Sequence, residues 1–319
     1  MCRDLKQASS LCAVRFVAAA IATLIVAGSA FAQTIDGGSD YTVILKSDGT
    51  VWTFGLNSSG QLGDGTTTMR PTPVQVSGLT DIVAVAAGQV HSMAITSTGS
   101  LYVWGSNAYG QIGDGTTTQR SSPVQSTLTN VVAIAAGNGH SLALRSNGDI
   151  YAWGLNGNGQ LGTGNTTQQT SPVLVATGGA AIAAGAFHSI FVKSDGSVYA
   201  TGLNSYGALG DASTTQRTTA VQMSGISTAV AAAAGDFSSL ILLSDGTMKG
   251  CGYNGQGSIG DGTTTDRSTP FRRSSSRNAR SPRGRARSRD STQARAKASS
   301  SRMPRSPKRV MAPSISSER

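Results

Sequence analysis

Short stretches in which apolar and polar residues alternate follow one another along most of this chain. Residues 101–104, Leu-Tyr-Val-Trp, are one example, and alternation with a period of two is typical of a β-strand with one buried face. Brief apolar runs that end in glycine precede such stretches, as residues 131–136 precede Gly137. Pairs such as Asn147-Gly148 separate successive strands and tolerate the positive φ angles of a hairpin turn. The pattern predicts an all-β protein.

The motif Gly-x-Asn-x-x-Gly recurs five times, at spacings of 50, 49, 48 and 50 residues. Its asparagines are Asn57, Asn107, Asn156, Asn204 and Asn254. Each motif is followed by a turn similar to Gly-Asp-Gly, and in three repeats by a Pro-Val pair. Together with the hairpin, this makes about four short antiparallel strands in each unit, which is one blade of a β-propeller. A β-solenoid is the competing architecture, although its repeats usually span only about 20–30 residues.

The repeats occupy residues 33–270. We assign five units, at about 36–87, 88–136, 137–184, 185–234 and 235–270. A single blade cannot bury both of its faces, so the blades are expected to stack around an axis. Because the asparagines recur at one phase of every unit, we interpret them as structural residues of this scaffold.

Composition agrees with this prediction. The chain of 319 residues has 40 glycines, and its only glutamate is Glu318; such a scarcity of helix formers argues against an α-rich fold. The net charge is +10, but residues 271–319 contain 15 of the 26 basic and 2 of the 16 acidic residues. Residues 1–270 therefore hold 11 basic and 14 acidic residues. Any attraction to nucleic acid or to a membrane surface belongs to the C-terminal segment alone.

The first 32 residues are predicted to be an export signal. Three basic residues precede an apolar run over residues 16–27, and Ala30 and Ala32 form an A-x-A cleavage site before Gln33. A membrane anchor is the alternative, but about 12 apolar residues are too few to cross a bilayer. We therefore expect an exported protein, whether secreted, periplasmic or at the cell surface, with no membrane span after cleavage.

Residues 271–319, which are rich in Arg and Ser, have two interpretations. The first is a disordered basic tail that binds nucleic acid electrostatically. The second is translation out of frame, because one restored base turns codons for Pro-Phe-Arg at residues 270–272 into Pro-Val-Gln, as at residues 73–75. Nucleic acid is a predicted partner only if this segment is genuine.

The histidines His91, His140 and His188 share one phase of the repeat, in the pattern Gly-x-x-His. A catalytic or metal-binding trio would converge from different phases, so we interpret them as structural, each with a hydrogen bond inside its own blade. A ligand role is the alternative. Asp64 and its counterparts in three other repeats could suggest calcium, but one carboxylate per repeat does not supply the several oxygen ligands that the ion needs. Turn-forming aspartates are the better interpretation, and we predict no metal site.

Patterns of enzyme chemistry are missing from the sequence. It has no nucleophile elbow, no His-Glu-x-x-His motif and no phosphate-binding loop. We predict a protein that is not an enzyme and needs no cofactor. Trp104 and Trp153 occupy the position before the repeat glycine, where Cys251 stands in the fifth unit. Core packing is their expected role, and Cys251 is expected to be buried and inert.

Two short segments vary while the rest of the repeat stays constant. They are the two residues after the motif asparagine and the two between Gly and His of Gly-x-x-His. Variable loop residues on a rigid scaffold are where partner contacts are found, and buried aromatics dominate interface energies. The aromatic candidates for partner binding are Tyr109, Phe187, Tyr206 and Phe237. The alternative is drift between repeats without a functional role.

Several elements together carry a family resemblance. Gly-x-x-His-Ser, the Ser-Asp-Gly turn, aromatic-x-Trp-Gly, Asn-x-x-Gly-Gln-Leu-Gly and Gly-Asp-Gly resemble the repeat of the regulator of chromosome condensation family over residues 36–270. That family includes alpha-tubulin suppressor-like proteins and secreted bacterial proteins, and it builds seven-bladed propellers. The resemblance implies a β-propeller here and, with five repeats, an incomplete ring.

The resemblance also implies a function, namely a non-enzymatic exported module that binds an unidentified protein through loops on one face. Guanine-nucleotide exchange on a small GTPase, as in the family's founding member, is the alternative. The predicted export argues against exchange, and the even spacing of 48–50 residues leaves no room for a large inserted loop. A polysaccharide-acting propeller enzyme is a third class, against which the lack of clustered acids counts.

Overall fold

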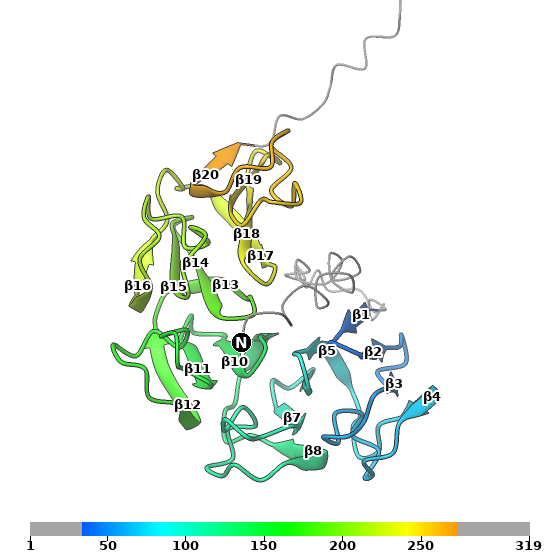
Figure 1. Cartoon of the computed structure of the whole chain (residues 1–319). Helices are drawn as coiled ribbons and strands as arrows, with labels where there is room; N and C mark the ends of the chain where they lie inside the picture. Colours follow the sequence, from blue (N-terminus) through cyan, green and yellow to red (C-terminus); the bar gives the residue numbers. More distant parts are fainter. Residues whose placement is uncertain (1–33, 273–319) are drawn as a thin grey trace, which may run out of the picture. The chain divides into compact units, whose positions relative to one another are not determined.

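The computed structural model describes residues 34–272, and every regular element in that range is a β-strand. The strands form five four-stranded sheets, in each of which sequence neighbours pair antiparallel (Figure 1). Sheet 1 contains β1 (Thr34–Gly37), β2 (Tyr41–Leu45), β3 (Val51–Gly55) and β4 (Arg70–Gln75). Sheet 2 contains β5 (Ile82–Ala87), β6 (His91–Thr96), β7 (Leu101–Gly105) and β8 (Arg120–Gln125). Sheet 3 contains β9 (Val131–Ala136), β10 (His140–Arg145), β11 (Ile150–Gly154) and β12 (Gln169–Ala176). Sheet 4 contains β13 (Gly179–Ala184), β14 (His188–Lys193), β15 (Val198–Gly202) and β16 (Arg217–Gln222). Sheet 5 contains β17 (Ala229–Ala234), β18 (Ser238–Leu243), β19 (Met248–Gly252) and β20 (Arg267–Arg272).

Local sequence accounts for the hairpin in the middle of each sheet. In β2, buried and half-buried residues alternate, as expected of a strand between two packed layers. The turn to β3 is held by Asp48, whose Oδ1 accepts a hydrogen bond of 2.9 Å from the Thr50 amide. Gly49 supplies the positive φ of 78° that the turn requires. Asp195 and Asp245 hold the equivalent turns of sheets 4 and 5 in the same way.

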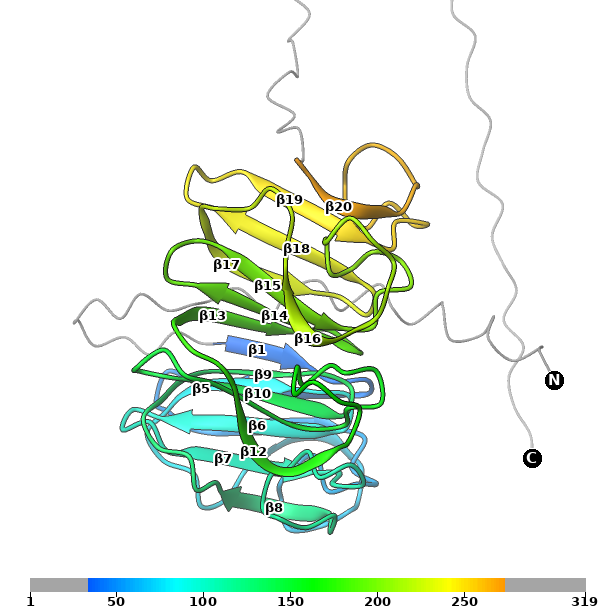
Figure 2. The same cartoon turned by 90° about the vertical axis from the view of Figure 1, so that its left-hand side faces the viewer.

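The sheets pack face to face in chain order. Their first strands β1, β5, β9, β13 and β17 contact one another in succession, and Figure 2 shows β13–β15 and β17–β19 in neighbouring layers. Each joint is filled by one apolar cluster; that between sheets 1 and 2 contains Val43 and Leu45 from one sheet and Ala94 and Trp104 from the other. Within residues 34–272, no strand of sheet 5 pairs with sheet 1, and the sheets do not close a ring.

The predicted all-β architecture of four-stranded blades is confirmed. The sheets, however, span residues 34–75, 82–125, 131–176, 179–222 and 229–272. Each of the first four units assigned from the sequence therefore ends with the first strand of the following sheet, because periodicity fixes the length of a repeat but not its phase. β20 extends to Arg272, two residues into the segment assigned to the tail.

Two predicted segments lie outside the described residues: the export signal and residues 273–319 of the basic segment. Residues 34–272 include no helix that is long and apolar enough to span a membrane.

Candidate functional site

Both variable segments of the repeat lie at the same end of each sheet. One belongs to the loop between the first and second strands, as at residues 88–90 between β5 and β6, and the other to the loop between the third and fourth, as at residues 106–119. In an antiparallel meander these alternate connections emerge on one side, and the Ser-Asp-Gly turns emerge on the other. We call the first side the loop face.

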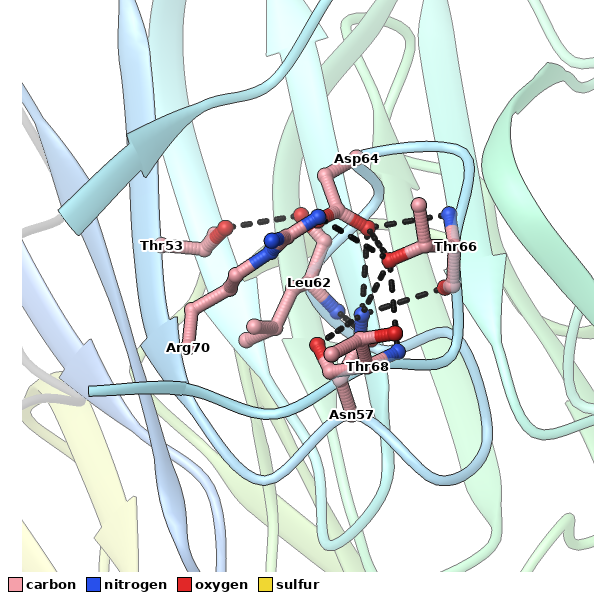
Figure 3. A network of polar contacts seen from close by, with 7 residues as sticks. All are labelled: Thr53, Asn57, Leu62, Asp64, Thr66, Thr68 and Arg70. Atoms are coloured by element: carbon pink, nitrogen blue, oxygen red, sulfur yellow. Dashed lines mark hydrogen bonds and ion pairs between the residues drawn. The ribbon is translucent and has the colours of Figure 1, made fainter. Parts of the chain in front are cut away.

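The repeated asparagine holds the longer of these loops together (Figure 3). Asn57 is fully buried. Its Oδ1 accepts a hydrogen bond of 3.0 Å from the Leu62 amide, and its Nδ2 donates to the carbonyl oxygens of Thr66 and Thr68, both at 3.1 Å. The other four asparagines make the same contacts in their own repeats. A single side chain thus closes a loop whose ends are eleven residues apart.

Asp64 completes this network and is paired with an arginine (Figure 3). Its Oδ1 accepts from the Thr66 amide at 3.0 Å, and its Oδ2 accepts from Arg70 Nε at 2.7 Å. Burial raises the pKa of Asp64, but hydrogen bonds from Thr66 and Arg70 outweigh that effect and hold this pKa below its usual value. The aspartate is thus a loop-forming residue, and the structure places it in no cluster of carboxylates among residues 34–272.

The aspartate–arginine pair recurs as a unit. Asp114–Arg120, Asp211–Arg217 and Asp261–Arg267 form the same ion pair in sheets 2, 4 and 5. In sheet 3, Thr163 replaces the aspartate and Gln169 replaces the arginine. The arginine was not predicted as a site residue from the sequence. It stands six residues after each aspartate, however, and it is replaced in the one repeat that also lacks the aspartate, so the pairing is visible in the sequence.

The three histidines link neighbouring sheets. Nε2 of His91 lies 2.9 Å from Ser141 Oγ of sheet 3, and His140 and His188 reach Ser189 and Ser239 of the following sheets, each at 3.0 Å. The expectation that each histidine bonds within its own blade is wrong. A Cβ on Gly88 would be 2.4 Å from His91 Cε1, so the glycine three residues earlier leaves the room that the imidazole occupies.

These imidazoles are neutral. Burial lowers the pKa of His91 to about 4, of His140 to about 3 and of His188 to about 4. Ser141 donates its only hydroxyl proton to the Gln111 carbonyl at 2.8 Å, so the histidine nitrogen is the donor of their shared hydrogen bond. The hydroxyl proton of this serine is donated to a carbonyl and not to the histidine, and the side chain is 0% exposed. The serine therefore lacks both the activating base and the access to substrate that a nucleophile requires. The pairs are therefore structural.

The residue before the repeat glycine also bonds across the joint. Trp104 Nε1 donates to the Gln61 carbonyl of sheet 1 at 3.0 Å, and Trp153 makes the same bond at 2.8 Å to the preceding sheet. Cys251 directs its thiol at the equivalent carbonyl, that of Ala208. Thr201 donates its hydroxyl instead to the Gly159 carbonyl, one residue earlier in the loop of the preceding sheet. Cys251 is fully buried, and this burial raises its pKa to about 12, so the thiol is unreactive.

Three of the four predicted binding aromatics come together on the loop face. The ring centroids of Phe187 and Phe237 are 6.2 Å apart, and those of Tyr206 and Phe237 are 5.4 Å apart. Tyr253 joins them, 5.2 Å from Tyr206. We call these four residues the aromatic cluster; they come from two loops of sheet 4 and two of sheet 5. Tyr109, which is 44% exposed, lies in sheet 2 beside Gly139 of sheet 3.

Tyr253 was not predicted because it precedes the motif asparagine, at a position that holds leucine or serine in the other repeats. The one sign in the sequence is that this position is aromatic only in the fifth repeat. Tyr206 is the most exposed member of the cluster, at 38%, and it contacts both Phe237 and Tyr253 across the joint between sheets.

The fold and the repeated joints agree with a known family, because the RCC1-like domain matches residues 14–300. The chain belongs to the RCC1-like domain family. A crystal structure of human WBSCR16 is similar to it, with 24% identity, 74% of this chain and 65% of that chain covered, and a TM-score of 0.67. Yeast RCC1 (Prp20) bound to Kap60 has 22% identity, coverage of 75% and 60%, and a TM-score of 0.66.

A second structure of Prp20p, from Saccharomyces cerevisiae, has 23% identity, coverage of 76% and 65%, and a TM-score of 0.66. That protein is described as binding Gsp1p and histones. These likenesses establish the fold of the RCC1-like chain. The chain spans less than two thirds of the length of each of these proteins.

Proposed function

We propose that this RCC1-like chain is an exported, non-enzymatic binding module that contacts another protein through the loop face of sheets 4 and 5. The observation that carries the proposal is the aromatic cluster, in which Phe187, Tyr206, Phe237 and Tyr253 meet at one joint. Export rests on the pattern of residues 1–32 alone.

Two of the four loops that present the cluster, those that carry Tyr206 and Tyr253, are held in place by their own hydrogen bonds, which suits them to tight binding. Asn204 and Asn254 are fully buried and each closes its loop with hydrogen bonds to two carbonyls and one amide. Little loop entropy is then lost on association. Aromatic rings supply large contact area with only two side-chain torsions to immobilise, which is why they dominate interface energies.

The family supports this kind of role. Prp20 is described in complex with Kap60 and as a protein that binds Gsp1p and histones, so a protein with this fold binds other proteins. The four rings of the aromatic cluster indicate what kind of partner this chain binds. We expect a protein surface with an apolar pocket or an exposed proline or aromatic side chain.

Photo-crosslinking tests the position of the surface. A photoreactive phenylalanine analogue placed at Tyr206 should capture the partner in the compartment to which the chain is exported. The same analogue at Ser227, an exposed residue between β16 and β17 at the opposite end of the sheets, should not. Equal capture at both positions would contradict a role for the loop face.

Affinity then tests the residues. With the captured partner purified, Tyr206→Ala and Phe237→Ala should each weaken binding at least about tenfold, the effect of losing a central aromatic contact, whereas Ser227→Ala should not. Unchanged affinity in both variants would remove the cluster from the interface. Release of a fluorescent guanine nucleotide from a small GTPase by the purified chain would favour nucleotide exchange instead. Recovery of an uncleaved chain, rather than one starting at Gln33, would refute processing at the predicted site.

A further inference from the structure

Charge is distributed unevenly between the two ends of the described sheets. The connections of the loop face, two in each sheet, contain seven aspartates and no lysine or arginine. Four arginines at the start of β4, β8, β16 and β20 pair with four of these carboxylates, so these groups together carry a net charge of −3. At the opposite end, five aspartates are balanced by five basic residues, which are Lys46, Arg145, Lys193, Lys249 and Arg272.

Two aspartates of the loop face stand next to members of the aromatic cluster. Asp236 directly precedes Phe237 and is close enough to His188 of sheet 4 for its charge to oppose the lowering of that pKa. Asp266 is exposed, and its Oδ1 accepts a hydrogen bond of 2.7 Å from the Asn254 amide, next to Tyr253. Negative charge and aromatic rings are thus combined at the joint between sheets 4 and 5.

This combination is peculiar to the fifth repeat. The position of Asp266, the last in the longer loop, holds methionine or glutamine in the other four sheets. The position of Asp236 holds serine, glutamine, asparagine or alanine. Tyr253 is likewise the only aromatic residue at its position. The scaffold therefore forms without any of the three, and their role is to be sought at the surface.

Rings flanked by carboxylates have the chemistry that recognises a cation. The face of an aromatic ring attracts a positive charge within about 6 Å of its centroid, and a nearby carboxylate adds to the attraction. The described chain makes such contacts elsewhere, since Lys46 Nζ lies 3.7 Å from the Trp52 centroid and Arg267 lies 4.9 Å from that of Phe271. Among residues 34–272, no lysine or arginine lies over the aromatic cluster.

We infer that the protein partner presents a lysine or arginine side chain to the aromatic cluster, with its positive charge beside Asp236 and Asp266. The inference rests on the proposed function and specifies the partner's chemistry: a basic segment, whose apolar or aromatic groups contact the same rings. The net negative charge of the loop face favours the approach of such a segment and orients it.

Isothermal titration of the full chain with a peptide of alternating glycine and lysine tests the site at low ionic strength, where charges are screened least. Asp236→Asn combined with Asp266→Gln should weaken binding at least about tenfold, because two attractive charges are lost. Tyr253→Leu should weaken it about two- to fivefold, the loss of one exposed cation–ring contact. Each replacement is the residue that another repeat already has at that position, so the variants are expected to fold.

The matched control removes the same amount of charge from the opposite end. Asp195→Asn combined with Asp245→Asn keeps the hairpin turns, since Asn147 holds the equivalent turn of sheet 3, and it should bind the peptide like the original chain. A peptide with glutamine in place of lysine should not bind. Equal weakening in both double variants, or equal binding of the glutamine peptide, would overturn the inference.

This inference and the proposed function fail in different ways. Suppose that the photoreactive analogue at Tyr206 captures a partner whose contact with the cluster contains no lysine or arginine. The proposed function would then stand and the inference would be wrong. Selective binding of the lysine peptide, with no partner captured at Tyr206, would contradict the proposed function while supporting the cation site. Crosslinking of Tyr206 to the chain's own basic C-terminal segment would overturn the assignment to a partner.

Discussion

Lowering the pH from 7 to 5 is expected to destabilise the folded protein through His91, His140 and His188. Burial lowers their pKa values to about 4, 3 and 4, whereas a histidine in an unfolded chain titrates near about 6.5. Between those values the unfolded chain binds protons that the folded chain cannot, so the free energy of unfolding falls as the pH falls. The stability that these groups contribute is present above about pH 6.5 and is lost in mild acid.

The magnitude follows from the three shifts. Each histidine at pH 5 lies about 1.5 pH units below its unfolded pKa, which corresponds to roughly 2 kcal/mol. Three such groups give on the order of 6 kcal/mol, comparable with the whole stability of many domains. The aspartates of the loops affect stability only at lower pH. The pKa values of Asp64, Asp114 and Asp211 are lowered from 3.8, so the stability that they contribute is lost only as the pH falls below that value.

Urea unfolding followed by tryptophan fluorescence at pH 7, 6 and 5 measures the effect, since Trp104 and Trp153 are fully buried. His140→Gln should reduce the pH-dependent part by about a third, whatever it does to the stability at pH 7. Equal free energies of unfolding at pH 7 and 5, or a full pH dependence in the variant, would mean that the imidazoles accept protons inside the folded protein. The assignment of three neutral, buried donors would then be refuted.

Three further predictions concern the scaffold. Asp64→Ala should lower the free energy of unfolding by about 1–3 kcal/mol because the part-buried amide and hydroxyl of Thr66 lose their acceptor, whereas Arg70→Ala, which removes a partly exposed partner, should cost at most about 1 kcal/mol; equal urea midpoints for the two would contradict this. Gly137→Ala places a Cβ 2.2 Å from an imidazole carbon and should strongly lower the melting temperature, while Gly157→Ala, with nothing within 4 Å, should leave it nearly unchanged. In a chain whose other two cysteines are replaced by serine, Cys251 should react with a thiol reagent only after unfolding, and fast labelling of the folded chain would disprove its burial.

Much of the site could be predicted from the sequence because its contacts join residues that are close along the chain. The asparagine network joins residues five to eleven positions apart, so it recurs as a visible motif. The partner arginine of each aspartate lies six residues away and was equally visible in principle. Tyr253 could not be assigned to the cluster from the sequence, because its contact with Tyr206 crosses from one sheet to the next.

The sequence by itself determined the strand period, the repeat of about 50 residues and therefore the all-β blade, since alternation and turn residues act over a few positions. Which strands share a sheet, and which residues meet between sheets, was decided only by tertiary structure. His91 and Ser141 are 50 residues apart, one full repeat, and a periodic sequence shows that both recur without showing that they touch.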